Sequence, residues 1–240
     1  MIEKNLKGIE VISFDVGFTL IYPHPPVGQV YAAIAAKYGY PVDAQQVHER
    51  FLRAWQQKTR DNRMPDQPHP LAAETTAFLW WQDIFRQAIG DHIPDDCLEI
   101  IFKECFYEYG RGRYWRIYDD VIPALNTLQE AFTLVVLSNW DLRLQQTLWE
   151  LKLDKYLKKI YISTQIGFAK PRERAFKHIL KDMGTAAETV LHIGDSLEDD
   201  FLAAQTAGLK AIHLNRNKKG DRRQNSSNNH RQISSLTELT

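Results

Sequence analysis

The stretch that most constrains the fold is a short apolar run that ends at an aspartate. Residues 9–14 read Ile-Glu-Val-Ile-Ser-Phe, and Asp15 follows, with Gly17 and Thr19 in the turn beyond it. An apolar, β-branched run of this length predicts a buried strand of a parallel sheet. Asp15 would then stand at the carboxyl edge of the sheet, where open α/β folds bind ligands. Taken alone, Asp15 could equally be a turn-capping residue.

The second half of the chain alternates between helical and strand-like segments. This alternation predicts a parallel sheet with crossover helices. The predicted strands are residues 133–137, 160–163, 190–193 and 210–214, and the predicted helices are residues 121–130, 144–151, 172–183 and 198–207. We therefore expect an α/β protein with a Rossmann-like, three-layer core around a parallel sheet.

A helical segment is inserted between the first predicted strand and the second. Residues 22–26 contain three prolines and predict a connector, and the four helices that follow are expected at residues 27–38, 44–60, 71–89 and 95–109. Asp43 is the predicted N-cap of the second helix. The predicted domains are a core of residues 1–22 and 117–240 and an inserted helical domain of residues 23–116. Residues 215–232 are expected to be mobile, and residues 235–239 to form a closing helical turn.

Composition excludes several classes of function. The 240 residues include 30 basic and 30 acidic side chains. The net charge is therefore zero and does not indicate nucleic acid as a partner. No apolar run approaches the roughly 20 residues that cross a bilayer, and the polar N-terminus does not resemble a signal peptide, so we expect no membrane association and a cytoplasmic location. Cys97 and Cys105 are expected to be buried thiols. The sequence gives no indication of oligomeric state.

Three strand-end residues and a lysine from a loop suggest a common site. If the strands that precede Asp15, Ser138 and Asp195 are neighbours, these side chains meet at one edge, and Lys170 can reach them from the loop before a helix. Two carboxylates at short range need a cation between them, and an oxygen-only site suits Mg²⁺. An ammonium and a hydroxyl beside them suit a phosphoryl group. The predicted cofactor is Mg²⁺, and the predicted partner is a small phosphorylated substrate.

At this point the sequence resembles the haloacid dehalogenase superfamily of hydrolases. The resemblance covers residues 9–214 and rests on four motifs in order: Asp15 with Thr19, Ser138, Lys170-Pro171, and Gly194-Asp195 with Asp200. The inserted helices are similar to the smaller cap domain of that family, which covers the active site as a lid. Trp80-Trp81, residues 138–141 and residues 194–196 are similar to one narrower subgroup.

The resemblance implies a role for each residue of the site. Asp15 would be the nucleophile that forms an aspartyl-phosphate, and Lys170 and Ser138 would neutralise and position the transferred group. Asp15, the backbone carbonyl of Gly17, and Asp195 would hold the metal, with Asp199 or Asp200 ordering its waters. The residues expected to contact substrate are Thr19, Asn139 and Arg143.

One position departs from the family's pattern. Its phosphatases carry a second aspartate, an acid and base, where this chain has Gly17, and proton transfer of that kind contributes about 10² to 10⁴ in rate. Three compensations are open: a proton from His24, a leaving group of low pKa, or phosphonate chemistry with Lys37 or Lys58. Carbon–halogen hydrolysis is disfavoured, because those relatives lack the metal-binding aspartate at position 195 and place an aromatic residue at position 17.

Two functional hypotheses follow. The first is a Mg²⁺-dependent phosphomonoester hydrolase of weak or specialised activity. The alternative is a pseudoenzyme that binds a phosphorylated ligand or a protein partner.

Overall fold

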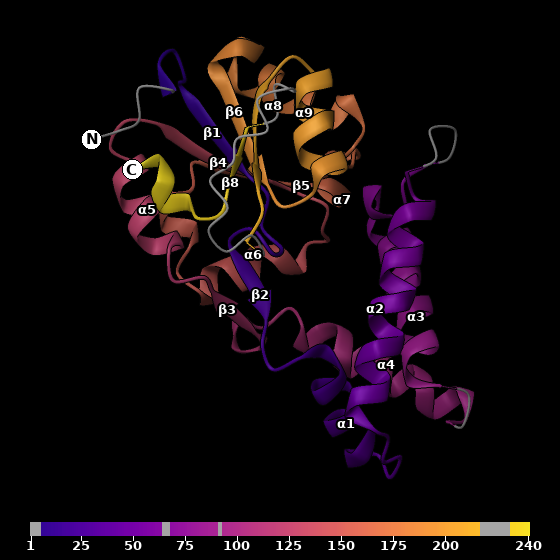
Figure 1. The fold of residues 1–240 in the computed structure, drawn as a ribbon. Coiled ribbons are helices and arrows are strands. Elements are labelled where there is room, and N and C mark those ends of the chain that lie inside the picture. Colours follow the sequence, from indigo (N-terminus) through magenta and orange to yellow (C-terminus); the bar gives the residue numbers. More distant parts are fainter. Residues whose placement is uncertain (1–5, 64–67, 91–92, 217–230) are drawn as a thin grey trace.

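The structure is a computed structural model that describes residues 6–63, 68–90, 93–216 and 231–240. Its main element is a six-stranded sheet in the order β5-β4-β1-β6-β7-β8, and every neighbouring pair is parallel (Figure 1). The strands are β1 (Val11–Phe14), β4 (Thr133–Ser138), β5 (Lys159–Ile162), β6 (Val190–Gly194), β7 (Lys210–Leu214) and β8 (Gln232–Ile233). The order confirms that the strands before Asp15 and Asp195 are neighbours, with the strand that ends at Ser138 on the other side of β1.

Helices cover both faces of this sheet. They are α5 (Val121–Leu128), α6 (Arg143–Glu150), α7 (Ser163–Ile166), α8 (Glu173–Met183) and α9 (Ala203–Thr206). Successive side chains of a strand point to opposite faces, so Ile12 and Phe14 pack in one cluster with α5 and α6, and Val11 packs in another with α8 and α9. The predicted three-layer α/β core is confirmed.

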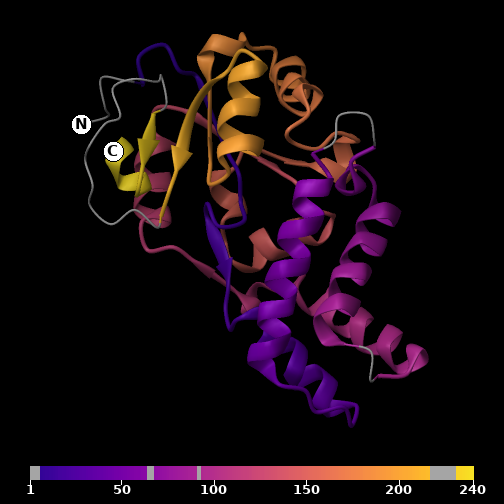
Figure 2. The same cartoon turned by 45° about the vertical axis from the view of Figure 1, so that its right-hand side comes forward.

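The inserted segment forms a separate group of helices beside one end of the core (Figure 2). They are α1 (Val27–Lys37), α2 (Ala44–Asp61), α3 (Glu74–Ile89) and α4 (Asp95–Glu108). We call this group the cap. It has its own buried cluster, with Tyr31, Phe85 and Phe102 among its members. Asp43 accepts a hydrogen bond from the backbone N–H of Gln46 at 2.7 Å, which confirms the predicted N-cap.

A two-stranded antiparallel ribbon joins the core to the cap. It consists of β2 (Ile21–Pro23) and β3 (Trp115–Ile117). The prediction of a connector from residue 22 onward was therefore wrong for Tyr22 and Pro23, because a proline is tolerated at the end of an edge strand. The separate buried clusters of core and cap support the two domains that we propose, residues 1–22 with 117–240 and residues 23–116.

Two predicted helices differ from the structure. The helix expected at residues 71–89 is interrupted at Ala73, whose backbone is extended between the 3-10 turn Pro70–Ala72 and α3. The helix expected at residues 198–207 begins as a π-helical turn, Leu197–Leu202, before α9. Such π turns are frequent at functional sites, and this one carries three acidic side chains.

The C-terminal segment is anchored to the core where it is described. Arg216 donates to the carboxylate of Asp120 at 2.9 Å and to the backbone carbonyl of Thr19 at 2.6 Å. The predicted mobile segment falls mostly on residues 217–230, which lie outside the described residues. The predicted closing turn is confirmed as the 3-10 helix Leu236–Leu239, capped by Ser235.

Two further expectations concern the cysteines and the membrane. Both thiols are free; the prediction that they are buried is confirmed for Cys105 and wrong for Cys97, which is half-buried. Among the described residues, no helix combines the length and the apolar character that crossing a bilayer requires.

The close approach of α1 and α2 depends on Gly28. A Cβ atom at this position would lie 2.5 Å from the backbone nitrogen of His48 and would also clash with the carbonyl of Ala44. Because backbone cannot move aside cheaply, we expect Gly28→Ala to lower the free energy of unfolding by about 1–3 kcal/mol. Urea denaturation measures this, and Gln29→Ala on the exposed face of α1 is the control, with a change within about 0.5 kcal/mol. A Gly28→Ala protein as stable as the parent would contradict this packing.

Candidate active site

Three polar side chains lie at the carboxyl edge of the sheet. Asp15 follows β1, Ser138 is the last residue of β4, and Asp195 follows β6. They converge because β4 and β6 flank β1 in parallel register. The backbone N–H of Asp15 donates to the carbonyl of Ile193 at 2.9 Å, which continues the pairing past the end of β1 and fixes the position of the aspartate.

Asp15 is held by an ammonium and a hydroxyl. Its Oδ1 accepts from Lys170 Nζ at 2.8 Å and from Ser138 Oγ at 3.1 Å, and the residue is only 8% exposed. Burial raises the pKa of Asp15 above its ordinary value, and the charge of Lys170 opposes that increase. The structure therefore brings together three of the residues that the sequence selected.

Lys170 lies between two carboxylates. Besides Asp15, its ammonium donates to Asp200 Oδ1. Burial opposes its charge, but Asp15 and Asp200 outweigh this and raise the pKa of Lys170 above its ordinary value. The side-chain amide of Asn139 fixes the Lys170 backbone, since it donates to the lysine carbonyl at 2.7 Å and accepts from the lysine N–H at 2.8 Å. Asn139 thus positions Lys170, and its predicted contact with substrate stays a prediction.

Asp200 has a partner that the sequence analysis missed. His192 Nε2 lies 3.0 Å from Asp200 Oδ1, and His192 Nδ1 lies 3.0 Å from Ser13 Oγ. Burial lowers the pKa of His192 below its ordinary value, so the ring is neutral; its Nε2–H donates to the carboxylate and its Nδ1 accepts from the hydroxyl. Although burial opposes ionisation, Lys170 and His192 lower the pKa of Asp200 below its ordinary value. The sequence did contain a signal for this role, because His192 is a polar residue within an otherwise apolar predicted strand.

Three carboxylates form a group that could hold a metal ion. One oxygen each of Asp15, Asp195 and Asp200 lies within 4.8 Å of the others. Burial, with the nearby charges of Asp15 and Asp200, raises the pKa of Asp195 well above its ordinary value. A buried site with three carboxylates and one ammonium carries excess negative charge, which a divalent cation with a preference for oxygen ligands would offset. The donor set therefore fits such an ion.

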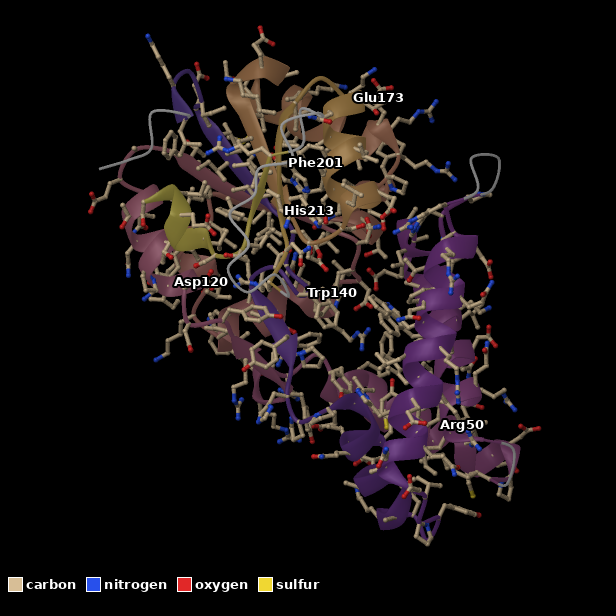
Figure 3. The ribbon with its side chains drawn as sticks, in the orientation of Figure 1. Arg50, Asp120, Trp140, Glu173, Phe201 and His213 are labelled. Atoms are coloured by element: carbon tan, nitrogen blue, oxygen red, sulfur yellow. The ribbon has the colours of Figure 1, made fainter. Side chains whose placement is uncertain are left out.

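The turn after Asp15 is tight and open to the site. Phe18 has a left-handed backbone (φ 57°), and Thr19 Oγ1 donates to Asp195 Oδ1 at 3.5 Å. A Cβ atom on Gly17 would meet only the ring of Trp140, at an ordinary contact distance of 3.8 Å. Trp140 itself lies where the core faces the cap (Figure 3). The space beside Gly17 is thus bounded by an indole ring, and no acidic side chain of the described residues lies within 4 Å of that Cβ position.

Two of the predicted residues face the cap. Asp199 accepts from Arg63 at 2.9 and 3.1 Å, at the end of α2, and lies outside the carboxylate group described above. Arg143 forms a two-fold ion pair with Asp141, at 2.7 Å for each contact, and its guanidinium lies over the ring of Phe106 in α4. Arg63 was missed, because its role depends on how the cap sits on the core.

The three side chains considered as replacements for the missing acid lie elsewhere. Lys37 pairs with Glu104 at 2.8 Å and Lys58 pairs with Asp83, both on the cap surface. Neither they nor His24 line the cavity that contains Asp15.

This cavity lies between core and cap and has a volume of about 500 Å³. Its core wall contains Asp15, Gly17, Ser138, Lys170 and Asp195. The cap wall is rich in aromatic side chains and includes residues from α2, α3 and α4. The size falls within the range of small-molecule sites.

Comparison with known proteins agrees with this architecture. The family model for haloacid dehalogenase-like hydrolases matches residues 9–208. The haloacid dehalogenase-like hydrolase domain-containing protein 3 of Xenopus laevis is 26% identical over 204 residues, which cover 84% of this chain and 82% of that protein. The Rhythmically expressed gene 2 protein of Drosophila melanogaster is 28% identical, with coverage of 85% and 82%. The first of these is the subgroup indicated by residues such as Trp80-Trp81.

Solved structures share the fold at low sequence identity. The HAD-hydrolase YfnB from Bacillus subtilis, bound to magnesium, gives a TM-score of 0.72 at 20% identity and covers 96% of both chains. The defluorinating L-2-haloacid dehalogenase Rha0230 gives a TM-score of 0.73 at 15% identity and covers 96% of this chain and 93% of its own. With the family model matching most of its length, the chain belongs to the haloacid dehalogenase-like hydrolases.

Proposed function

We propose that this hydrolase is a Mg²⁺-dependent phosphomonoester phosphatase that works through an aspartyl-phosphate at Asp15. The observation that carries the proposal is the arrangement around that carboxylate, with Lys170 Nζ at 2.8 Å, Ser138 Oγ at 3.1 Å and three acidic groups within 4.8 Å of one another. An ammonium, a hydroxyl and an acidic metal-binding group together suit a phosphoryl group better than a carboxylate or a halide.

In this mechanism the Asp15 carboxylate attacks phosphorus and the ester oxygen leaves with the bonding electrons. Lys170 and Ser138 neutralise and orient the transferred group, since both already contact the nucleophile. A water then cleaves the aspartyl-phosphate and regenerates the carboxylate. A bound Mg²⁺ would supply charge neutralisation for the phosphoryl oxygens.

We assign the metal to Asp15, Asp195 and the Gly17 carbonyl, with Asp200 close enough to bind it directly or through water. Asp199 is assigned to the contact with Arg63, which occupies its carboxylate. The predicted substrate contacts of Thr19, which lies beside Asp195, and of Arg143, at the cap boundary, remain part of the proposal.

A second candidate is a pseudoenzyme that binds a phosphorylated ligand without turnover. The observation that favours it is the glycine at position 17, which has no side chain to act as the acid that the family's phosphatases carry there. Both candidates share the same binding site, so only turnover separates them.

Asp15→Asn tests the enzyme. We expect Mg²⁺-dependent hydrolysis of at least one phosphate monoester, which chelation abolishes and Asp15→Asn reduces by more than about 10³-fold, because the amide is a poor nucleophile. Steady-state phosphate release with and without Mg²⁺ measures this. Asp96→Asn, an exposed acid at the start of α4, is the matched control and should be unchanged. If no ester is hydrolysed faster than by Asp15→Asn, the protein is not a phosphatase.

Gly17→Asp tests the missing acid. A Cβ atom at position 17 makes only an ordinary contact with Trp140, so an aspartate there should protonate the leaving group of an alkyl phosphate and raise kcat by about 10² to 10⁴. Gly17→Asn, of equal size and without a proton to give, is the control. Equal rates for these two variants would show that proton transfer does not limit turnover.

Asp195→Asn tests the metal site without relying on activity. Isothermal titration calorimetry should find Mg²⁺ affinity reduced at least about tenfold, because a carboxylate ligand and its charge are lost. Asp199→Asn should bind Mg²⁺ as the parent does, since that carboxylate is engaged by Arg63. The reverse pattern would place the metal at Asp199 and contradict our assignment.

A further inference from the structure

The aromatic character of the cavity begins next to the proposed nucleophile. Phe18, three residues after Asp15, contacts Trp55 of α2 with ring centroids 5.8 Å apart. Trp140, two residues after Ser138, contacts Trp115 with centroids 4.9 Å apart. All four rings line the cavity. The leaving group of a phosphate ester bound against Asp15 would therefore extend into a cavity lined by these aromatic side chains.

The cationic side chains of the cavity are already neutralised. Among the described residues, the Lys and Arg side chains that line it are Arg63, Arg143 and Lys170. Arg63 is paired with Asp199 at 2.9 Å, Arg143 with Asp141 at 2.7 Å, and Lys170 with Asp15 at 2.8 Å. A substrate with a second phosphate or a carboxylate would have to displace one of these pairs, so the cavity favours a leaving group without charge.

Four titratable side chains that line the cavity, His69, Cys105, Tyr31 and Tyr109, are poorly suited to protonate an alkoxide. Burial and the charge of Arg172 lower the pKa of His69 to about 4, so this ring is neutral at physiological pH. Burial raises the pKa of the Cys105 thiol and of the Tyr31 and Tyr109 phenols far above their ordinary values. Because Gly17 has no side chain to donate a proton and these four groups do not replace it, the cavity favours a leaving group that is stable as an anion.

We propose that the substrate is an aryl phosphate monoester whose ring lies between the Phe18–Trp55 and Trp115–Trp140 pairs. This rests on the proposed phosphatase function and names its substrate class. A phenol has a pKa of about 10, far below that of an alkyl alcohol, so the bond from phosphorus to the aryl oxygen breaks without an acid. Asp15 forms the new bond to phosphorus, and the aryloxide leaves with the electron pair. Water then hydrolyses the aspartyl-phosphate, and the proton that this step releases converts the aryloxide to the phenol.

Matched substrates test this in the intact protein with Mg²⁺. Phenyl and 2-naphthyl phosphate release alcohols of similar acidity but differ in apolar area, so kcat/KM should be about tenfold higher for the naphthyl ester. Phenyl and cyclohexyl phosphate are similar in size but differ in leaving-group acidity, so kcat should be about 10² lower for the cyclohexyl ester. Glucose 6-phosphate, with a hydroxylated leaving group, should be the poorest of the four. A glucose 6-phosphate turnover that exceeds that of naphthyl phosphate would overturn the inference and leave the phosphatase function intact.

The Trp55→Ala variant tests where the aryl ring of the substrate lies. It should remove the naphthyl advantage over phenyl phosphate, whereas Trp149→Ala, an indole 67% exposed on α6 and outside the cavity lining, should keep it. An unchanged naphthyl advantage in Trp55→Ala would overturn the proposed position.

Calorimetry with phenylphosphonate and methylphosphonate, which are not hydrolysed, separates binding from catalysis. Tighter binding of phenylphosphonate, lost in Trp55→Ala, supports the aryl site. Equal affinities overturn it. If phenylphosphonate is preferred but no ester turns over above Asp15→Asn, the aryl ligand site stands and the hydrolase function does not.

Discussion

The ammonium group of Lys170 lies between the carboxylates of Asp15 and Asp200, and all three side chains are almost fully buried. Without that positive charge, the strand ends of β1 and β6 would bring acidic groups together in a medium that screens their repulsion poorly. The lysine is fixed in turn by the side-chain amide of Asn139, which holds its backbone on both sides. Because one ammonium does not balance three carboxylates, the site is still acidic enough to favour a divalent cation.

The site and the cap are linked through neighbouring residues of one π-helical turn. Asp200 faces inward to Lys170 and His192, whereas Asp199, the residue before it, pairs with Arg63 of the cap. A second link joins Arg143, after the second motif, to Phe106 of α4. The position of the cap is therefore set by contacts with the same loops that carry the polar site, and the cavity between them takes its aromatic walls from both sides.

Much of the core and of the site was predictable, because parallel strands deliver their carboxyl ends to one edge. Asp15, Ser138 and Asp195 could be grouped from three strand patterns and their terminal residues alone, and Lys170 from its place before a helix. Asp43 was predictable as an N-cap because capping depends on residues that are close in sequence. The interruption at Ala73 and the π turn before α9 were not predicted, because periodicity does not distinguish these backbone variants from a regular helix.

The sequence by itself determined the class of fold, the order of the motifs and the absence of an aspartate at position 17, since each depends on local pattern or on residue identity. Only the tertiary structure decided which of Asp199 and Asp200 joins the acidic group, that His192 supports it, and that Arg63 and Arg143 are engaged at the cap boundary. These contacts join residues from different elements, and their geometry depends on how the cap packs on the core. The aromatic lining of the cavity was decided in the same way, because Trp55, Trp115 and Trp140 are distant in sequence and line one cavity only when both domains are in place.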